Sequence, residues 1–270
     1  MNDPDVKLLV FIVLTVGLIG AFMFFWDDIR PSADTPVVMH HEPEVEEQVV
    51  TDEPLHPIEP LTSSGPSNKE LVPLPPLDDS DAYFLLELTD IFGVDVARLF
   101  VSEALIDKFV ATVDNLTRSH VSEKIRPVGR LPDAFVVDTS GGIGQLYLSS
   151  ENYGRYDLLV DLIASSDLEV VAEMYRRFYP LFQQSYERLG YPNAYFNDRV
   201  VEVIDHLLLT PEPEEPVGLS RPHVLYEFAD ANLEALSSGQ KLLLRMGREH
   251  TITIKRVLRD LRALVAQSPI

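Results

Sequence analysis

The sequence contains no cysteine in its 270 residues and only one long apolar run. The lack of cysteine excludes disulfides and thiolate nucleophiles, so cysteine usage favours neither side of a membrane. Basic residues are also scarce, because 22 Lys and Arg stand against 43 Asp and Glu, for a formal net charge of −21. This excess of negative charge argues against nonspecific nucleic-acid binding, which needs cationic side chains to neutralise phosphates.

Signatures of catalysis are missing as well. The chain has no GxSxG nucleophile elbow, no Walker A motif and no HExxH zinc motif. Residues 141–144 read GGIG, which contains GxG alone and is typical of a hairpin turn. The glutamates on predicted helices show nothing that separates a catalytic pair from exposed helix residues. We therefore predict no catalytic residue, no cofactor and no metal site, and favour a non-enzymatic protein.

The one long apolar run covers residues 8–26 and reads LLVFIVLTVGLIGAFMFFW. A helix of about 19 residues is roughly 29 Å long, which matches the hydrocarbon core of a bilayer. A cleaved signal peptide would have a shorter run and a small-residue cleavage site, whereas this run ends in Trp26 and two aspartates. A buried core helix would be shorter or interrupted by polar residues. The run predicts a single uncleaved transmembrane helix after a short tail at residues 1–7.

The orientation of that helix rests on a small difference in charge. Lys7 precedes the run and Arg30 follows it, so the positive-inside bias is slight. The short N-terminus most simply stays in the cytoplasm, and the rest of the chain then crosses the membrane. We expect a bacterial inner-membrane protein with a periplasmic domain; the alternative is a domain that faces the cytoplasm.

Residues 27–76 change the character of the chain. They hold ten of its 20 prolines and eleven acidic residues, against Arg30 and Lys69 as the bases. Such a segment buries too little apolar surface to offset the entropy of ordering, so we predict a disordered linker. As a random coil it spans roughly 40 Å. The alternative to a plain spacer is a docking segment, for which residues 73–77 (PLPPL) are the best candidate. The same residues are equally suited to be the first stretch that packs onto the folded domain.

Residues 77–270 are numerous enough for a globular core, and their 30 acids and 19 bases give a net charge of −11. Apolar residues at helical spacing predict helices over 84–92, 105–116, 168–189, 200–208 and 258–265. Residues 135–138 and 145–148 flank a glycine-rich stretch, which predicts a β-hairpin, and 224–228 is a candidate third strand. We predict a mainly α fold: a helical domain with a small β-hairpin element.

The densest aromatic and polar stretch runs from residue 175 to residue 199. Tyr and Arg side chains concentrate binding energy at interfaces, although tyrosines on a long helix commonly complete a core. Both alternatives stay open. The residues that form the candidate partner-binding surface are Tyr179, Tyr186, Arg188, Tyr191, Tyr195, Asn197 and Arg199.

A basic stripe near the C-terminus contrasts with the acidic chain. Residues 241–262 hold seven Lys and Arg against two acids, and Lys255, Arg259 and Arg262 share one helical face. A solvated face with local ion pairs is the simplest interpretation. Lipid headgroups or an acidic partner are alternatives. A further alternative is that the acidic tract at 42–59 of the same chain docks on these three bases.

The order of four segments carries a resemblance to a known family. They read PLPPLDDSDAYFLLEL, LFVSEALIDKFVATVDNL, FYPLFQQSYERLGYPNAYFNDRVVEVIDHLL and LYEFADANLEALSSGQKLLLRMG. Over about residues 70–266 the chain resembles the bacterial domain-of-unknown-function family 3014. The resemblance implies a proteobacterial, membrane-anchored protein and assigns no activity and no catalytic residue.

Two functions remain as hypotheses. The first is a non-enzymatic adaptor of the cell envelope: an inner-membrane anchor, a linker that gives reach, and a helical domain that binds a protein or cell-wall partner. The second is a cell-wall glycan hydrolase or modifying enzyme, which requires two carboxylates in one cleft. An adaptor layout of this kind is an analogy of architecture and does not itself specify function.

Overall fold

The computed structural model describes residues 53–60, 72–94, 100–128, 134–223 and 225–266. Its helices, 3-10 helices and strands follow one another in the order η3 (Leu77–Asp79), α2 (Asp81–Phe92), α4 (Leu105–Asn115), η4 (Glu123–Ile125), β1 (Val137–Asp138), β2 (Leu146–Leu148), η5 (Ser150–Tyr156), α5 (Asp157–Ala164), α6 (Leu168–Arg188), α7 (Phe196–Leu208), β3 (Gly218–Ser220), β4 (Glu227–Phe228), α8 (Ala231–Glu234), α9 (Ser238–Arg245) and α10 (Arg248–Val265). The predicted mainly helical fold with a small β element is confirmed.

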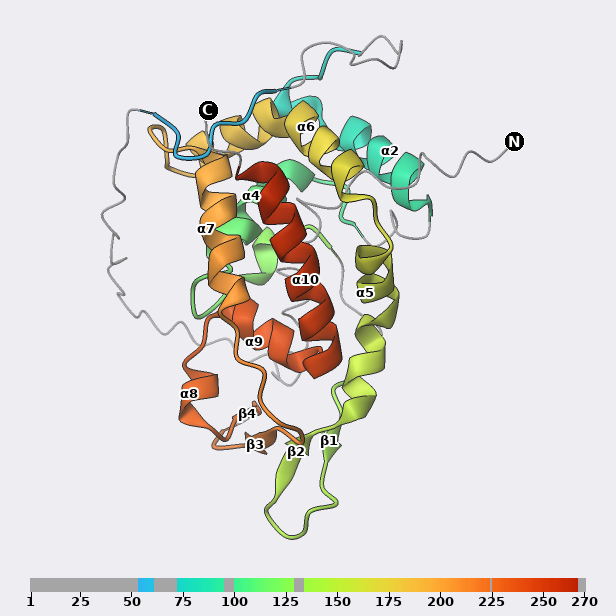
Figure 1. The fold of residues 1–270 in the computed structure, drawn as a ribbon, viewed down its shortest axis with the longest axis vertical. Helices are drawn as coiled ribbons and strands as arrows, with labels where there is room; N and C mark the ends of the chain where they lie inside the picture. The colour runs from blue at the N-terminus through green and yellow to red at the C-terminus, as the bar shows by residue number, and fades with distance from the viewer. Residues whose placement is uncertain (1–52, 61–71, 95–99, 129–133, 224, 267–270) are drawn as a thin grey trace, which may run out of the picture.

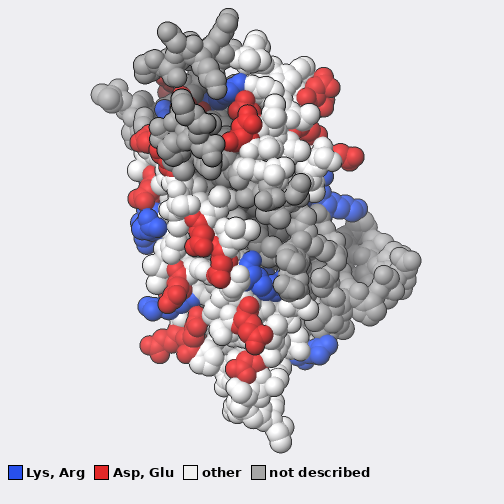
Figure 2. Space-filling model, turned by 90° about the vertical axis from the view of Figure 1, so that its right-hand side faces the viewer, with Lys and Arg blue, Asp and Glu red and all other residues white. Residues whose placement is uncertain are grey.

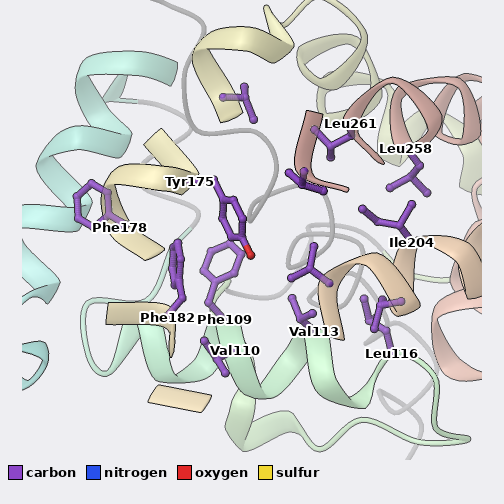
Figure 3. Packing of buried hydrophobic residues seen from close by; sticks show 14 of the residues in the cluster. Phe109, Val110, Val113, Leu116, Tyr175, Phe178, Phe182, Ile204, Leu258 and Leu261 are labelled. Carbon is purple, nitrogen blue, oxygen red and sulfur yellow. The ribbon is translucent and has the colours of Figure 1, made fainter. Parts of the chain in front are cut away.

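The main core lies among α4, α6, α7 and α10, and α2 and α5 pack at its sides (Figure 1). The long helix α6 begins at Asp167, whose carboxylate accepts a hydrogen bond from the Glu169 amide. Its apolar face is buried along its length, and Figure 3 shows Phe182 of α6 close to Phe109 of α4. Each such side chain contributes roughly 1.5–3 kcal/mol when it is fully buried. The helix continues through Pro180, which lacks the main-chain N–H of a helical bond, and the burial of its apolar face offsets that loss.

A buried ion pair ties α7 to α4 inside this core. The Arg199 Nε lies 3.1 Å from the Asp114 Oδ1, and the two side chains are 7% and 2% exposed. The same guanidinium donates to the Asp114 carbonyl and to the Thr117 hydroxyl. A buried charge is tolerated only when it is paired and hydrogen-bonded, and here both conditions are met.

The strands form one antiparallel sheet in the order β1-β2-β3-β4. The predicted hairpin is present as β1 and β2, and β4 lies within the candidate third strand at 224–228. The strand β3 was not predicted. The sheet has its own small core, which is built around Leu148, Leu219 and Phe228. The β1–β2 hairpin projects from one end of the molecule in Figure 1, and Ile143 in its turn is fully exposed.

Several predicted boundaries move in the structure. Helix α7 begins at Phe196 and α10 at Arg248, both earlier than the apolar spacing indicates. The short helices α5 and α9 were not predicted as separate elements. The 3-10 helix η5 runs directly into α5 and links the sheet to the helical core.

The predicted transmembrane helix at residues 8–26 lies outside the described residues, as do the tail at 1–7 and most of the predicted linker. Across the described ranges, no helix has both the length and the apolar character needed to span a bilayer. Two parts of the predicted linker, 53–60 and 72–76, are described. Ile58 and Leu74 pack against the core of the helical domain, and for residues 73–77 this packing is one of the alternatives that the sequence left open.

Candidate functional site

A cavity of about 740 Å³ opens where the sheet meets the helical core. Three segments that are distant in sequence line it: the η5–α5 junction, the loop after α7, and the α9–α10 junction. The lining residues are Tyr153, Asp157, Glu212, Glu214, Glu215, Met246, Gly247, Arg248, Glu249 and His250. Binding sites of proteins are usually concave pockets of this size, with polar groups supplied by several elements.

The turn between α9 and α10 sets the floor of this cavity. Gly247 has a φ of +86°, a conformation that residues with a Cβ rarely adopt. A Cβ at this position would also lie only 2.8 Å from the Tyr153 ring. A glycine is therefore required twice over, once by the sharp turn and once by the close approach of the aromatic ring.

Negative charge dominates the lining, in which five carboxylates face one guanidinium, that of Arg248. Figure 2 shows acidic side chains spread over the lower half of one face, above the projecting hairpin. The Glu215 carboxylate accepts a hydrogen bond from the Arg248 amide at the start of α10, at 3.2 Å. A carboxylate there interacts favourably with the positive end of the helix dipole.

Two of the carboxylates have basic partners. The Lys255 Nζ lies 2.6 Å from the Glu212 Oε1 and also donates to the Thr210 carbonyl. The hydrogen bond from Lys255 holds the pKa of Glu212 below its usual range, so this carboxyl stays ionised. The His250 Nε2 lies 3.1 Å from the Asp157 Oδ1.

The hydroxyl of Tyr153 stays protonated at neutral pH. Burial and then the negative charge of Glu215 raise the pKa of Tyr153 well above its usual value. The cavity thus presents ionised carboxylates as acceptors, together with a phenol and a guanidinium as donors.

This arrangement is suited to the binding of positively charged groups. A general acid of a glycosidase needs a raised carboxyl pKa, whereas the shift at Glu212 is downward. Within the described ranges, no group of three or more His, Asp or Glu side chains is placed to hold a metal ion. Carboxylates spread around an open cavity match positively charged groups of a ligand.

The sequence model of one protein family matches residues 105–262, and the family is described as protein of unknown function (DUF3014). The chain belongs to this family. All ten residues that line the cavity fall within the matched range. The match confirms the resemblance to this family over residues 105–262, whereas the first of the four segments, residues 73–88, lies outside the matched range. No curated protein and no solved structure matches the chain.

Within the DUF3014 domain, the predicted partner-binding residues do not form one exposed surface. Tyr186, Asn197 and Arg199 are buried, and Tyr179 is only 9% exposed. Tyr186 stacks on the half-buried Tyr191, with 4.6 Å between ring centroids. These tyrosines complete the core, which is the packing alternative that the sequence left open.

The other members of that predicted set have different surroundings. Arg188 is exposed at the end of α6 and pairs with Asp78 through both guanidinium nitrogens. Tyr195 is half-buried and stands immediately before α7. A role of Arg188 and Tyr195 in partner binding stays a prediction.

The three bases of the predicted basic stripe differ in their contacts and exposure. Lys255 is buried against Glu212, and Arg262 forms two hydrogen bonds to Asp205 of α7. Arg259 is exposed. In the described part of the chain, residues 53–60 make no ion pair with these three bases. The described end of the acidic tract docks elsewhere, on the first turn of α7.

Sequence reasoning missed the cavity itself. The loop at 211–216 reads PEPEEP and follows the helix predicted over 200–208. Three glutamates among prolines are a signal of a rigid acidic loop, but the other two walls come from segments roughly 60 and 35 residues away along the chain. Only the fold brings these walls together.

Proposed function

We propose that this DUF3014 protein is a membrane-anchored adaptor of the bacterial envelope, and that its helical domain binds a basic segment of a partner protein in the acidic cavity. The supporting observation is the cavity of about 740 Å³ with five carboxylates in its lining. The predicted transmembrane helix at residues 8–26 places such a domain near one membrane surface. The chain then acts by holding a partner, without chemistry of its own.

A protein segment rich in Lys or Arg fits this cavity better than a single small cation. The carboxylates come from three walls, so several positive charges at peptide spacing can each meet one of them. Glu214 and Glu249 are exposed at the opening and form no ion pair with another described residue. These two side chains are available to a partner without first breaking an internal contact.

Titration with a basic peptide tests the proposal. The full chain in lipid nanodiscs is titrated with fluorescently labelled hexa-arginine, and fluorescence polarisation is measured at low and high salt. The double variant Glu214→Gln, Glu249→Gln should weaken binding by about twofold to thirtyfold at low salt, because each exposed ion pair contributes about 0.2–1 kcal/mol. Binding should also weaken as the salt concentration rises.

A matched control removes the same charge elsewhere. The double variant Glu169→Gln, Glu173→Gln changes two exposed acids of α6 that are not among the lining residues. Its affinity should equal that of the parent chain. Equal weakening by both double variants would mean that net charge alone attracts the peptide, and the cavity would lose its assigned role.

A further inference from the structure

Residues 53–60, called the clasp here, bind to the first turn of α7 through their backbone. The amides of Leu55 and His56 donate to the two carboxylate oxygens of Asp198, at 3.0 and 2.7 Å. The Asn197 side chain donates to the His56 carbonyl at 2.7 Å. Figure 1 shows this segment beside the start of α7, at the end of the molecule opposite the hairpin.

The Asn197 side chain is held in place by contacts within the domain that do not involve the clasp. Its side chain is fully buried, accepts a hydrogen bond from the Tyr175 hydroxyl of α6, and donates to the Val265 carbonyl at the end of α10. One amide thus joins three helices and still offers a hydrogen to an incoming carbonyl. A receptor group that is already oriented loses little entropy when it binds.

The clasp segment is itself suited to reversible docking. Prolines stand at positions 54, 57 and 60, and they restrict the backbone to extended conformations, which lowers the entropy cost of ordering it. Few apolar contacts add to the hydrogen bonds: Ile58 packs against the core, whereas Leu55 is 64% exposed. Segments with few buried apolar contacts open at a lower free energy than the core.

We propose that the first turn of α7 is a peptide-docking site whose occupant is the chain's own residues 53–60, and that the clasp opens while the helical domain stays folded. Recognition runs through backbone groups, so the site requires an extended segment that presents two successive N–H donors, those of residues 55 and 56, and the carbonyl of residue 56. His56 adds a half-buried ring whose Nδ1 has no hydrogen-bond partner. Opening the clasp returns this nitrogen to water.

One consequence rests on the membrane anchor of the proposed function. With the clasp closed, residues 27–52 separate the predicted membrane helix from the first docked residue. The next described residues against the domain begin at 72. Opening the clasp therefore moves the first described point of attachment along the chain from residue 53 to residue 72.

A distance measurement in the full chain tests the clasp. The chain has no cysteine, so the exposed sites Glu59→Cys and Ala263→Cys take spin labels selectively. Double electron–electron resonance in lipid nanodiscs should give one narrow distance distribution. Adding Leu55→Pro, which removes one donor to Asp198, should broaden it, whereas Leu55→Ala keeps the N–H and should not.

Hydrogen exchange on the domain side gives an independent readout. Asp198→Ala should speed amide exchange of residues 53–60 about tenfold or more, because a hydrogen bond to a charged acceptor is worth at least that factor. Exchange in α4 and α10 should not change. Glu59→Gln removes a charge from the clasp without touching Asp198 and should leave the exchange rates as they are.

Two results would overturn the proposal. One is a narrow distance distribution that survives Leu55→Pro. The other is exchange in residues 53–60 that accelerates only together with exchange in α7, which would mean that the segment is an integral part of the fold. Neither measurement involves the acidic cavity or a basic peptide, so failure of the clasp and failure of the proposed function are seen separately.

Discussion

Arg199 and Asp114 form a buried ion pair between α7 and α4, with 3.1 Å between the Arg199 Nε and the Asp114 Oδ1. Asp114 also pairs with Arg118, which is 54% exposed, and accepts a hydrogen bond from the Tyr191 hydroxyl, so Arg199→Met leaves a buried carboxylate that is only partly compensated. Arg199→Met should therefore lower the free energy of unfolding by about 3 kcal/mol, the lower end of the range for a broken buried pair. Urea unfolding followed by far-UV circular dichroism measures the change.

Arg188→Met is the matched control for this prediction. Arg188 pairs with Asp78 at the surface, where ion pairs contribute about 1 kcal/mol or less. The two arginines were predicted as members of one binding surface, and the structure gives them different environments. Equal losses of stability in the two variants would contradict the account of the buried pair.

Gly247→Ala should destabilise the domain by about 1–3 kcal/mol. The added Cβ meets the Tyr153 ring at 2.8 Å, and the backbone keeps a positive φ. Gly142→Ala provides the comparison, because Gly142 also has a positive φ but has open space around it. Thermal unfolding of both variants separates overpacking from backbone strain: equal shifts in Tm would leave no role for the contact with the ring.

The pH dependence of stability should include a contribution from His206. Burial and then the charge of Arg199 hold the pKa of His206 below its ordinary value of 6.5. The folded state therefore favours the neutral ring, and this contribution is complete above pH 6.5. It is lost as the pH falls from 6.5 through the lowered pKa, where the unfolded chain binds the proton more readily.

His206→Gln should remove that part of the pH dependence. The Nε2 of His206 lies 2.8 Å from the Ser237 hydroxyl, and Gln keeps a polar group there. Urea unfolding at pH 7.5 and pH 5 should show a smaller difference in stability for the variant than for the parent chain. An unchanged difference would assign the acid sensitivity to other groups.

Asn152 attaches the sheet to the helical core. Its buried side chain accepts a hydrogen bond from the Val136 amide and donates to the carbonyls of Val136 and Ser149. Asn152→Ala leaves these groups unpaired, so we expect a loss of about 1–3 kcal/mol and faster amide exchange in β1 and β2. Ile143→Ser, at the exposed turn of the same hairpin, should leave both stability and exchange unchanged.

The helices with strong periodicity were predictable from sequence. Apolar residues at helical spacing located α2, α4 and α6, because one face of each helix is buried and the opposite face is not. Helix α5 was missed since its eight residues, of which Leu159, Val160 and Ile163 are buried, are too few to establish a helical period. Strand β3 was missed because three residues carry too little alternation to indicate a strand.

The functional surfaces were harder to predict than the elements. The tyrosines near residue 186 have the composition of an interface, and burial is what distinguishes them from one. The acidic cavity depends on the φ of Gly247 and on three separate segments. The clasp could not be predicted, because it depends on the two carboxylate oxygens of Asp198 accepting backbone hydrogen bonds at the first turn of α7. No local sequence pattern indicates such a contact.

The bonds of Asn197 have a mechanical consequence. A pulling force that arrives from the N-terminal side of the chain reaches residues 53–60 before it reaches α2. At the clasp, the load passes to the Asp198 carboxylate and to the Asn197 amide, both part of α7, and the amide is also bonded to α6 and α10. Tension from the N-terminal side thereby reaches three helices at the end of the molecule opposite the hairpin as long as the clasp holds.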